Sequence, residues 1–208
     1  MERNWKINIK DPIRGREEKV REKGLTMVLD KGMGTNQLED LLMTGSNYID
    51  FIKFSFGTSF CYTSEILEKK IKMIKEKNID VYPGGTLFEV AFSQNKTNEF
   101  LFRAKQLGFT AIEISNGTIN LNSDIRRQVI KKASALGFRV LTEVGKKDRK
   151  LSLTLTEIIS QIKDDIASGA DGVIIEGRES GREIGIYNKD GSVDMKKFNG
   201  IVNAFSDR

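Results

Sequence analysis

Six short apolar segments of this chain end in side chains that could carry out chemistry. The groups at or just beyond their ends are Asp30 and Lys31; Lys53 and Ser55; Gly84, Gly85 and Thr86, with Glu89 soon after; Glu113, Ser115 and Asn116; Glu143, Lys146 and Lys147; and Glu176, Arg178, Glu179 and Ser180. Barrels and open α/β sheets form their active sites at the carboxyl ends of parallel strands. If the six segments are neighbouring parallel strands, their polar ends share one rim.

This rim would combine carboxylates with cations, and it lacks histidine because the whole sequence has none. That absence excludes zinc sites with histidine ligands, Ser-His-Asp triads and a histidine general base. Acid-base chemistry falls to carboxylates, lysine, tyrosine or cysteine, and a metal ion should be a hard, oxygen-bound one such as Mg2+. The combination suits a phosphorylated or carboxylated small molecule that reacts through an enolate-like intermediate.

We assign hypothetical roles from the chemistry of each group. The candidates for metal binding, or for the shell around a metal, are the carboxylates Asp30, Glu113, Glu143 and Glu176. The candidate catalytic residues are Lys147 as proton donor, Glu143 and Lys53. The candidate substrate-binding residues are Lys53, Gly84, Gly85, Ser115, Asn116, Arg178 and Ser180.

Several of these groups have a structural alternative. Lys53 could extend to solvent from an edge strand, but an inward lysine between two apolar residues needs a partner, which Asp30 or Glu113 could supply. Gly84 and Gly85 could serve only a tight turn rather than an anion site.

A second group is weaker still as evidence for a site. Lys146 and Lys147 form a basic pair in a predicted loop, where lysines are usually solvated. Cys61 is expected to be a small buried residue, because no base is at hand to activate its thiol.

The spacing of the apolar segments predicts the elements that position the rim. The segments begin at Thr26, Asp50, Ile79, Ala111, Arg139 and Gly172, which are 24, 29, 32, 28 and 33 residues apart. That is the length of a strand-helix unit. Helix-period segments lie between them: Ser123 can cap one, Thr154 and Glu157 form a capping box for another, and a last helix is expected near Met195 to Phe205.

Regular alternation of this kind predicts an α/β fold of the (β/α)8 TIM-barrel type. Only about six units are visible in residues 1–208, and a closed barrel would need roughly 50 more residues at this spacing. Either the single domain is incomplete at its C-terminal end, or the sheet is open, or another chain covers the gap. Residues 1–24 are expected to form an N-terminal extension.

The amino-acid composition restricts what kind of ligand the protein binds and where in the cell we expect it. The chain has 34 basic and 29 acidic residues, and the basic residues are interleaved with acids, which argues against nucleic-acid binding. One cysteine rules out a disulfide framework and fits a reducing compartment. No apolar stretch is long enough to span a membrane, and the first residues lack the apolar core of a signal peptide. We therefore expect a cytoplasmic protein that acts on small anions.

Six motifs in order resemble the phosphosulfolactate synthase family, the coenzyme M pathway enzymes and their bacterial relatives. The motifs are GLTMVLDKGMG, YIDFIKFSFGTS, GGTLFE, IEISNGT, LTEVGKKD and IIEGRESG, from about Gly24 to Tyr187. The resemblance implies a Mg2+-dependent barrel enzyme, usually a homo-oligomer. It implies the addition of sulfite to phosphoenolpyruvate to give (2R)-phospho-3-sulfolactate, with an aci-carboxylate intermediate.

The chain also departs from the family pattern. Family members continue with further strands, including IFEAP-like and GPNVNLGNI-like segments, whereas this sequence stops at Arg208 with neither. Phosphate sites of barrels often use the loops after strands seven and eight. Two alternatives therefore stay open: a non-catalytic family member that acts as a binding or stress-associated protein, and another barrel lyase or isomerase acting on a phosphorylated acid.

Overall fold

The computed structural model of the protein describes residues 17–146, 153–177 and 181–205. Strands and helices alternate along it, as the spacing predicts. The strands are β1 (Met27–Asp30), β2 (Phe51–Phe54), β3 (Asp80–Pro83), β4 (Ala111–Ile114), β5 (Arg139–Val144) and β6 (Gly172–Ile175). The helices are α1 (Thr35–Gly45), η1 (Ser46–Tyr48), η2 (Ser55–Gly57), α2 (Thr58–Cys61), α3 (Ser64–Lys75), α4 (Gly85–Ser93), α5 (Thr97–Leu107), α6 (Ser123–Ala135), α7 (Leu155–Ala167) and α8 (Met195–Asn203).

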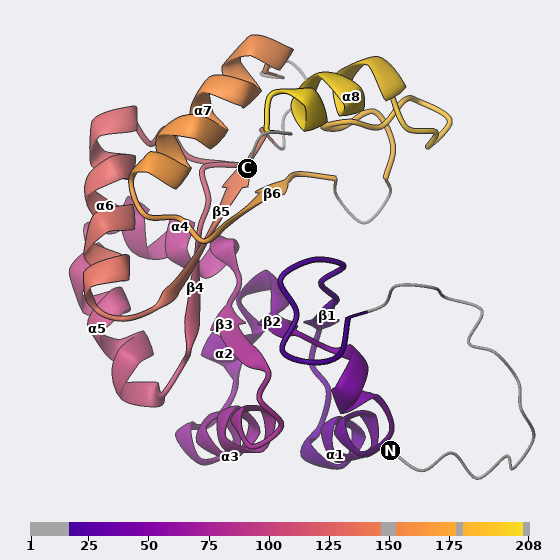
Figure 1. The fold of residues 1–208 in the computed structure, drawn as a ribbon. Helices are drawn as coiled ribbons and strands as arrows, with labels where there is room; N and C mark the ends of the chain where they lie inside the picture. The colour runs from indigo at the N-terminus through magenta and orange to yellow at the C-terminus, as the bar shows by residue number, and fades with distance from the viewer. Residues whose placement is uncertain (1–16, 147–152, 178–180, 206–208) are drawn as a thin grey trace, which may run out of the picture.

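The strands form two parallel sheets of three, in the orders β1-β2-β3 and β4-β5-β6. The sheets meet at the N-terminal ends of β3 and β4, where the amide of Thr110 donates to Val81 O and the amide of Val81 donates to the Thr110 hydroxyl. Helices lie along the outer side of both sheets (Figure 1). This is a partial (β/α) barrel, and the predicted fold class is confirmed.

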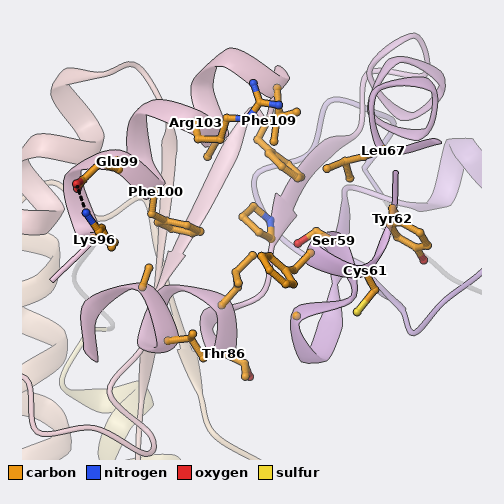
Figure 2. A pocket seen from close by; sticks show the side chains of 18 of the residues that line it. Ser59, Cys61, Tyr62, Leu67, Thr86, Lys96, Glu99, Phe100, Arg103 and Phe109 are labelled. Atoms are coloured by element: carbon orange, nitrogen blue, oxygen red, sulfur yellow. Dashed lines mark hydrogen bonds and ion pairs between the residues drawn. The ribbon is translucent and has the colours of Figure 1, made fainter. Parts of the chain in front are cut away.

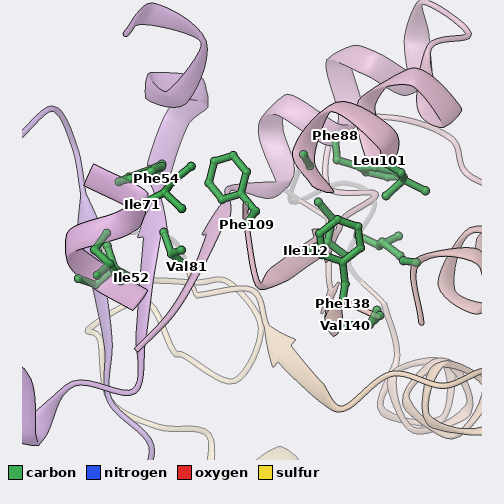
Figure 3. Packing of buried hydrophobic residues seen from close by; sticks show 14 of the residues in the cluster. Ile52, Phe54, Ile71, Val81, Phe88, Leu101, Phe109, Ile112, Phe138 and Val140 are labelled. Carbon is green, nitrogen blue, oxygen red and sulfur yellow. The ribbon is translucent and has the colours of Figure 1, made fainter. Parts of the chain in front are cut away.

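Side chains of alternate strand residues pack in two separate layers. The larger core lies between strands and helices and includes Ile52, Phe54, Val81, Ile112 and Val140 (Figure 3). The inner face of the strands carries a smaller cluster, made of Phe51, Tyr82, Ala111 and Leu141 with Met27 and Ile174 packed against it. Because side chains alternate along a strand, this division fixes which residues face the barrel interior.

Local sequence signals explain where several helices begin. The capping box expected for α7 is present: Thr154 accepts from the amide of Glu157, and Glu157 accepts from the amide of Thr154. Helix α6 begins at Ser123, but its cap is Asn122, whose side chain accepts from the amide of Ile125. The predicted cap was wrong by one residue, because asparagine and serine are equally good caps.

The part of the predicted N-terminal extension that the structure describes lies across the amino ends of the strands. Lys19 donates to the carbonyls of Ser46 and Lys77, at 3.0 and 2.8 Å. Arg21 is buried and pairs with Asp50 at 3.0 Å. Residues 17–24 are thus anchored at the end of the barrel opposite to the polar strand ends.

Within the described residues, no helix is long and apolar enough to cross a membrane.

Candidate active site

Lys53, Glu113 and Glu143 project from three strands into the barrel interior. In the sheet registers, Lys53 lies opposite Tyr82, and Glu113 lies opposite Leu141. Since Tyr82 and Leu141 belong to the inner cluster, their partners face the same interior. The sequence placed these three residues at strand ends, and the structure brings them together.

Lys53 is the ammonium at the centre of this group. Its Nζ lies 2.9 Å from Oε1 of Glu113 and 3.9 Å from Oε2 of Glu143. Burial on its own would lower the pKa of Lys53, but the carboxylates of Glu113, Glu143 and Glu176 outweigh it and leave that pKa above its ordinary value. The side chain therefore stays charged at neutral pH, and Glu113 rather than Asp30 is the partner that it needs.

Glu113 is 1% exposed, and its two carboxylate oxygens differ in their surroundings. Oε1 accepts from Nζ of Lys53 and from the amide of Gly85, both at 2.9 Å. Oε2 is buried and has no hydrogen-bond partner among the described residues. Burial, and then the charge of Glu113, raises the pKa of the neighbouring Tyr82 well above its usual range, so its phenol stays protonated. A buried carboxylate oxygen without a donor marks a place for a cation or for a group of the substrate.

A network of hydrogen bonds surrounds the end of β4. The hydroxyl oxygen of Ser115 lies 2.5 Å from Oε1 of Glu89 and 2.9 Å from Oε1 of Glu143. All three side chains are buried. Glu89 follows the third apolar segment, but no role is predicted for it from the sequence. The sequence does contain a signal for Glu89, because it is the one acidic residue in the mostly apolar helix segment GTLFEVAFS, which predicts a buried carboxylate that needs partners.

Asp30 does not belong to this group, so its assignment as a metal ligand is corrected. In the register it lies opposite Phe54, a residue of the outer core, and its side chain therefore leaves β1 on the helix side. There it pairs with Nζ of Lys70 at 2.6 Å and accepts from the amides of Gly32 and Met33. Both members of the pair are fully buried.

Gly84 and Gly85 pack against the site rather than cradle an anion. The amide of Gly84 donates to Phe54 O, and the amide of Gly85 donates to Glu113, so neither is left for a ligand. A Cβ on Gly85 would lie 2.6 Å from Oε1 of Glu113 and from Cβ of Ser115. The alternative predicted for this pair was a tight turn, whereas Gly84 is extended and Gly85 begins α4, so close packing is a role that the sequence did not predict.

The remaining predicted residues divide between the rim and the part of the chain that is not described. Asn116 is buried, and its carbonyl accepts from Nζ of Lys146 at 2.6 Å, while Ile119 O accepts from the same group at 2.8 Å. Lys146 is therefore only partly exposed, and two backbone carbonyls hold its ammonium against the turn that follows β4. Glu176 is buried and close enough to Lys53 to raise its pKa. Lys147, Arg178, Glu179 and Ser180 lie outside the described residues.

A cavity of about 850 Å3 lies away from these strand ends, between α2 and the α4–α5 pair. Phe100, Phe109 and Leu67 point into it, and its rim carries the ion pair of Lys96 and Glu99 (Figure 2). Cys61 lines it and is exposed, contrary to the expectation of a buried thiol, because it ends a short helix at the surface. The cavity lacks the buried, convergent charges of the strand-end site.

Replacing Gly85 by alanine should destabilise the protein by about 1–3 kcal/mol and disturb the Glu113 carboxylate, because the new methyl group overlaps that carboxylate and Ser115. Urea unfolding measures the change. The matched control is Gly34→Ala, since nothing lies within 4 Å of a Cβ at Gly34. Equal stability of the two variants would contradict the close packing described here.

Comparison with known proteins gives a consistent result. The sequence model described as "(2R)-phospho-3-sulfolactate synthase (ComA)" matches residues 14–208. The phosphosulfolactate synthase of Methanocaldococcus jannaschii is 48% identical over 174 residues, which cover 83% of this chain and 69% of that protein. The phosphosulfolactate synthase of Bacillus subtilis is 38% identical, over 91% of this chain and 74% of that protein.

Solved structures share the fold at low sequence identity. The carboxyl transferase domain of Rhizobium etli pyruvate carboxylase with oxamate and biotin has a TM-score of 0.52 at 12% identity, over 88% of this chain. The chain spans about a third of that protein, 34%. The N-acetylneuraminate lyase of Mycoplasma synoviae has a TM-score of 0.50 at 13% identity, over 88% of this chain and 59% of that one. At such identities the likeness concerns the barrel fold alone.

Proposed function

Because the chain belongs to the (2R)-phospho-3-sulfolactate synthase (ComA) family, we propose that it is a lyase that adds sulfite to C3 of phosphoenolpyruvate to give (2R)-phospho-3-sulfolactate. The observation that carries this proposal is the ammonium of Lys53, held inside the barrel by carboxylates at the strand ends. Attack of sulfite at C3 moves negative charge onto the carboxylate of the substrate. A fixed cation beside that carboxylate stabilises the charge as it develops.

The same residues fit a divalent metal ion, and we propose Mg2+. The carboxylates of Glu113, Glu143 and Glu176 gather around the ammonium of Lys53 at the strand ends, and carboxylate oxygens are the protein ligands that Mg2+ prefers. No three carboxylates of the described part of the chain are grouped as a complete metal site. Mg2+ does not need such a cage, because it is usually held by one or two carboxylates together with water and substrate oxygens.

Glu113, through its unpartnered Oε2, and Glu143 or Glu176 are the residues that would hold the metal ion. When bound, it would supply positive charge to the oxygens of the substrate. Asp30 is left out, because Lys70 already neutralises it.

Completion of the reaction requires a proton at C2, and we keep Lys147 as the proposed donor. Its neighbour Lys146 is held by two backbone carbonyls, so the two lysines have different roles in this proposal. Arg178 and Ser180 remain proposed ligands of the anionic substrate. A homo-oligomeric, cytoplasmic enzyme of the coenzyme M pathway or a related bacterial route remains part of the same proposal.

An assay with phosphoenolpyruvate, sulfite and Mg2+ tests the function, read as loss of the enol absorbance. We expect a loss that depends on all three additions and yields one product with a new carbon-sulfur bond by mass spectrometry. Treatment with a chelator should abolish it, and added Mg2+ should restore it.

Two results would contradict the proposal in different ways. Activity that is indifferent to the chelator would remove the metal ion while keeping the reaction. Phosphoenolpyruvate binding in calorimetry without any turnover at high protein concentration would favour the non-catalytic alternative.

A further inference from the structure

The carboxylate of Glu89 is a buried charge to which the proposed reaction gives no task. Glu89 lies on α4 and is 2% exposed. Among the described residues, its carboxylate forms no ion pair with a lysine or arginine, although its charge opposes the lowering of the Lys146 pKa by burial. Burial of an unpaired carboxylate is costly unless hydrogen bonds compensate for the lost water. The compensating donors therefore indicate what this carboxylate is for.

All of the donors come from one turn, residues 115–118, which directly follows β4. Oε1 of Glu89 accepts from the amide of Gly117 at 2.8 Å and lies 2.5 Å from the hydroxyl of Ser115. Oε2 accepts from the amide of Thr118 at 3.1 Å and from the Thr118 hydroxyl. Hydrogen bonds to an ionised acceptor are about twice as strong as neutral ones. The conformation of the turn thus depends on one carboxylate of a neighbouring helix.

The turn that Glu89 holds carries part of the candidate site. Its Ser115 hydroxyl lies 2.9 Å from Oε1 of Glu143, and the carbonyl of its Asn116 accepts from Nζ of Lys146. The turn therefore joins the end of β4 to the end of β5 and to the loop that follows β5. An apolar residue in place of Glu89 would pack into the same core at lower cost, but it could not hold these donors.

We propose that Glu89 is a positioning residue, which fixes the 115–118 turn so that Ser115 stays against Glu143 and Asn116 stays at the strand ends. The proposal rests on the proposed function for its effect on turnover, but the holding of the turn stands apart from it. Two variants remove the contact from opposite sides. Glu89→Gln takes away the charge with little change of shape, and Thr118→Val removes a donor from an exposed residue.

Amide hydrogen exchange measures how firmly the 115–118 turn is held, and it needs no substrate. Glu89→Gln replaces one of the two acceptor oxygens by an NH2 group, so at least one of the amides of Gly117 and Thr118, which donate to different oxygens, should exchange about tenfold faster or more. The amides within β4 should keep the protection of the unaltered protein. Unchanged exchange at Gly117 and Thr118 in a folded Glu89→Gln variant would overturn the proposal, whatever the activity.

Steady-state kinetics measure how a loosened turn affects turnover. Loss of a residue that orients a group in the site typically lowers activity roughly 10- to 100-fold. We expect that loss in kcat for Glu89→Gln and a smaller one for Thr118→Val, with KM for phosphoenolpyruvate changed much less. A fall in stability with kcat unchanged would show a merely structural carboxylate.

A control at the opposite end of the barrel separates a loss of stability from a specific effect on the turn and on turnover. Asp50→Asn alters an acid that is also buried but pairs with Arg21. It should lower the melting temperature and leave both kcat and the exchange at Gly117 unchanged. If the unaltered protein shows no sulfite-dependent turnover, the proposed function fails, and the exchange measurement still decides for or against Glu89. If Glu89→Gln does not fold, Thr118→Val carries the same two measurements.

Discussion

Lys53→Met should lower kcat about 10²- to 10³-fold, the loss typical of removing one fixed group that stabilises charge in a transition state. The ammonium of Lys53 lies between Glu113 and Glu143, and methionine fills similar space without the charge. Sulfite-dependent consumption of phosphoenolpyruvate measures the effect. Lys53→Arg should not restore activity, because the planar guanidinium differs in size and geometry from the compact ammonium.

The stability of the same variant needs its own control, since Lys53→Met leaves Glu113 buried and without its cation. The double variant Lys53→Met, Glu113→Gln removes both charges and should regain much of the lost stability while staying inactive. Lys131→Met, which alters an exposed lysine, should behave as the unaltered protein. Recovery of turnover in the double variant would show that Lys53 only neutralises Glu113.

Lys70→Met should reduce the free energy of unfolding by about 3–5 kcal/mol, because it leaves the carboxylate of Asp30 buried and unpaired. Both side chains are 0% exposed, their charged atoms are 2.6 Å apart, and Lys70 also lies over the ring of Tyr62, 4.2 Å from its centroid. Urea unfolding measures the loss.

A matched variant on the same helix tests whether burial is the cause. Lys72→Met removes a lysine whose pair with Glu76 is exposed and 4.0 Å long, so it should cost less than about 1 kcal/mol. Asp30→Asn should resemble Lys70→Met in stability. If Asp30→Asn instead abolished Mg2+-dependent activity in a stable protein, Asp30 would return to the metal site.

Much of the fold could be predicted from the sequence because its signals are local. Caps and apolar stripes each act over a few residues and indicate helices, and short apolar segments, which recur at the length of a strand-helix unit, located the six strands. The division of the strands into two sheets could not be predicted in this way. It depends on how β3 and β4 meet, through Thr110 and Val81 near their amino ends, and these two residues are 29 apart in the sequence.

Local sequence likewise predicted some residues of the candidate site and missed others. Lys53 and Glu113 are charged residues between apolar neighbours in a strand, a pattern that predicts an inward charge with a partner. Asp30 ends its strand between Leu29 and Lys31, and it lies one residue out of phase with the inward positions of that strand, which only the register reveals. Glu89 is on a helix, and a search of strand ends cannot give it a role.

The arrangement of the two sheets has a consequence for affinity. Lys53 belongs to the first sheet and Glu143 to the second. Within the described strands, the backbones of β3 and β4 are joined near their amino ends through Thr110 and Val81, and at the carboxyl ends the sheets are joined by side chains, Lys53 with Glu113 and Glu143. A ligand that contacts both residues also joins the two halves of the barrel. A mutation at the distant Thr110 that alters how the two sheets are joined should therefore change ligand affinity without touching the ligand.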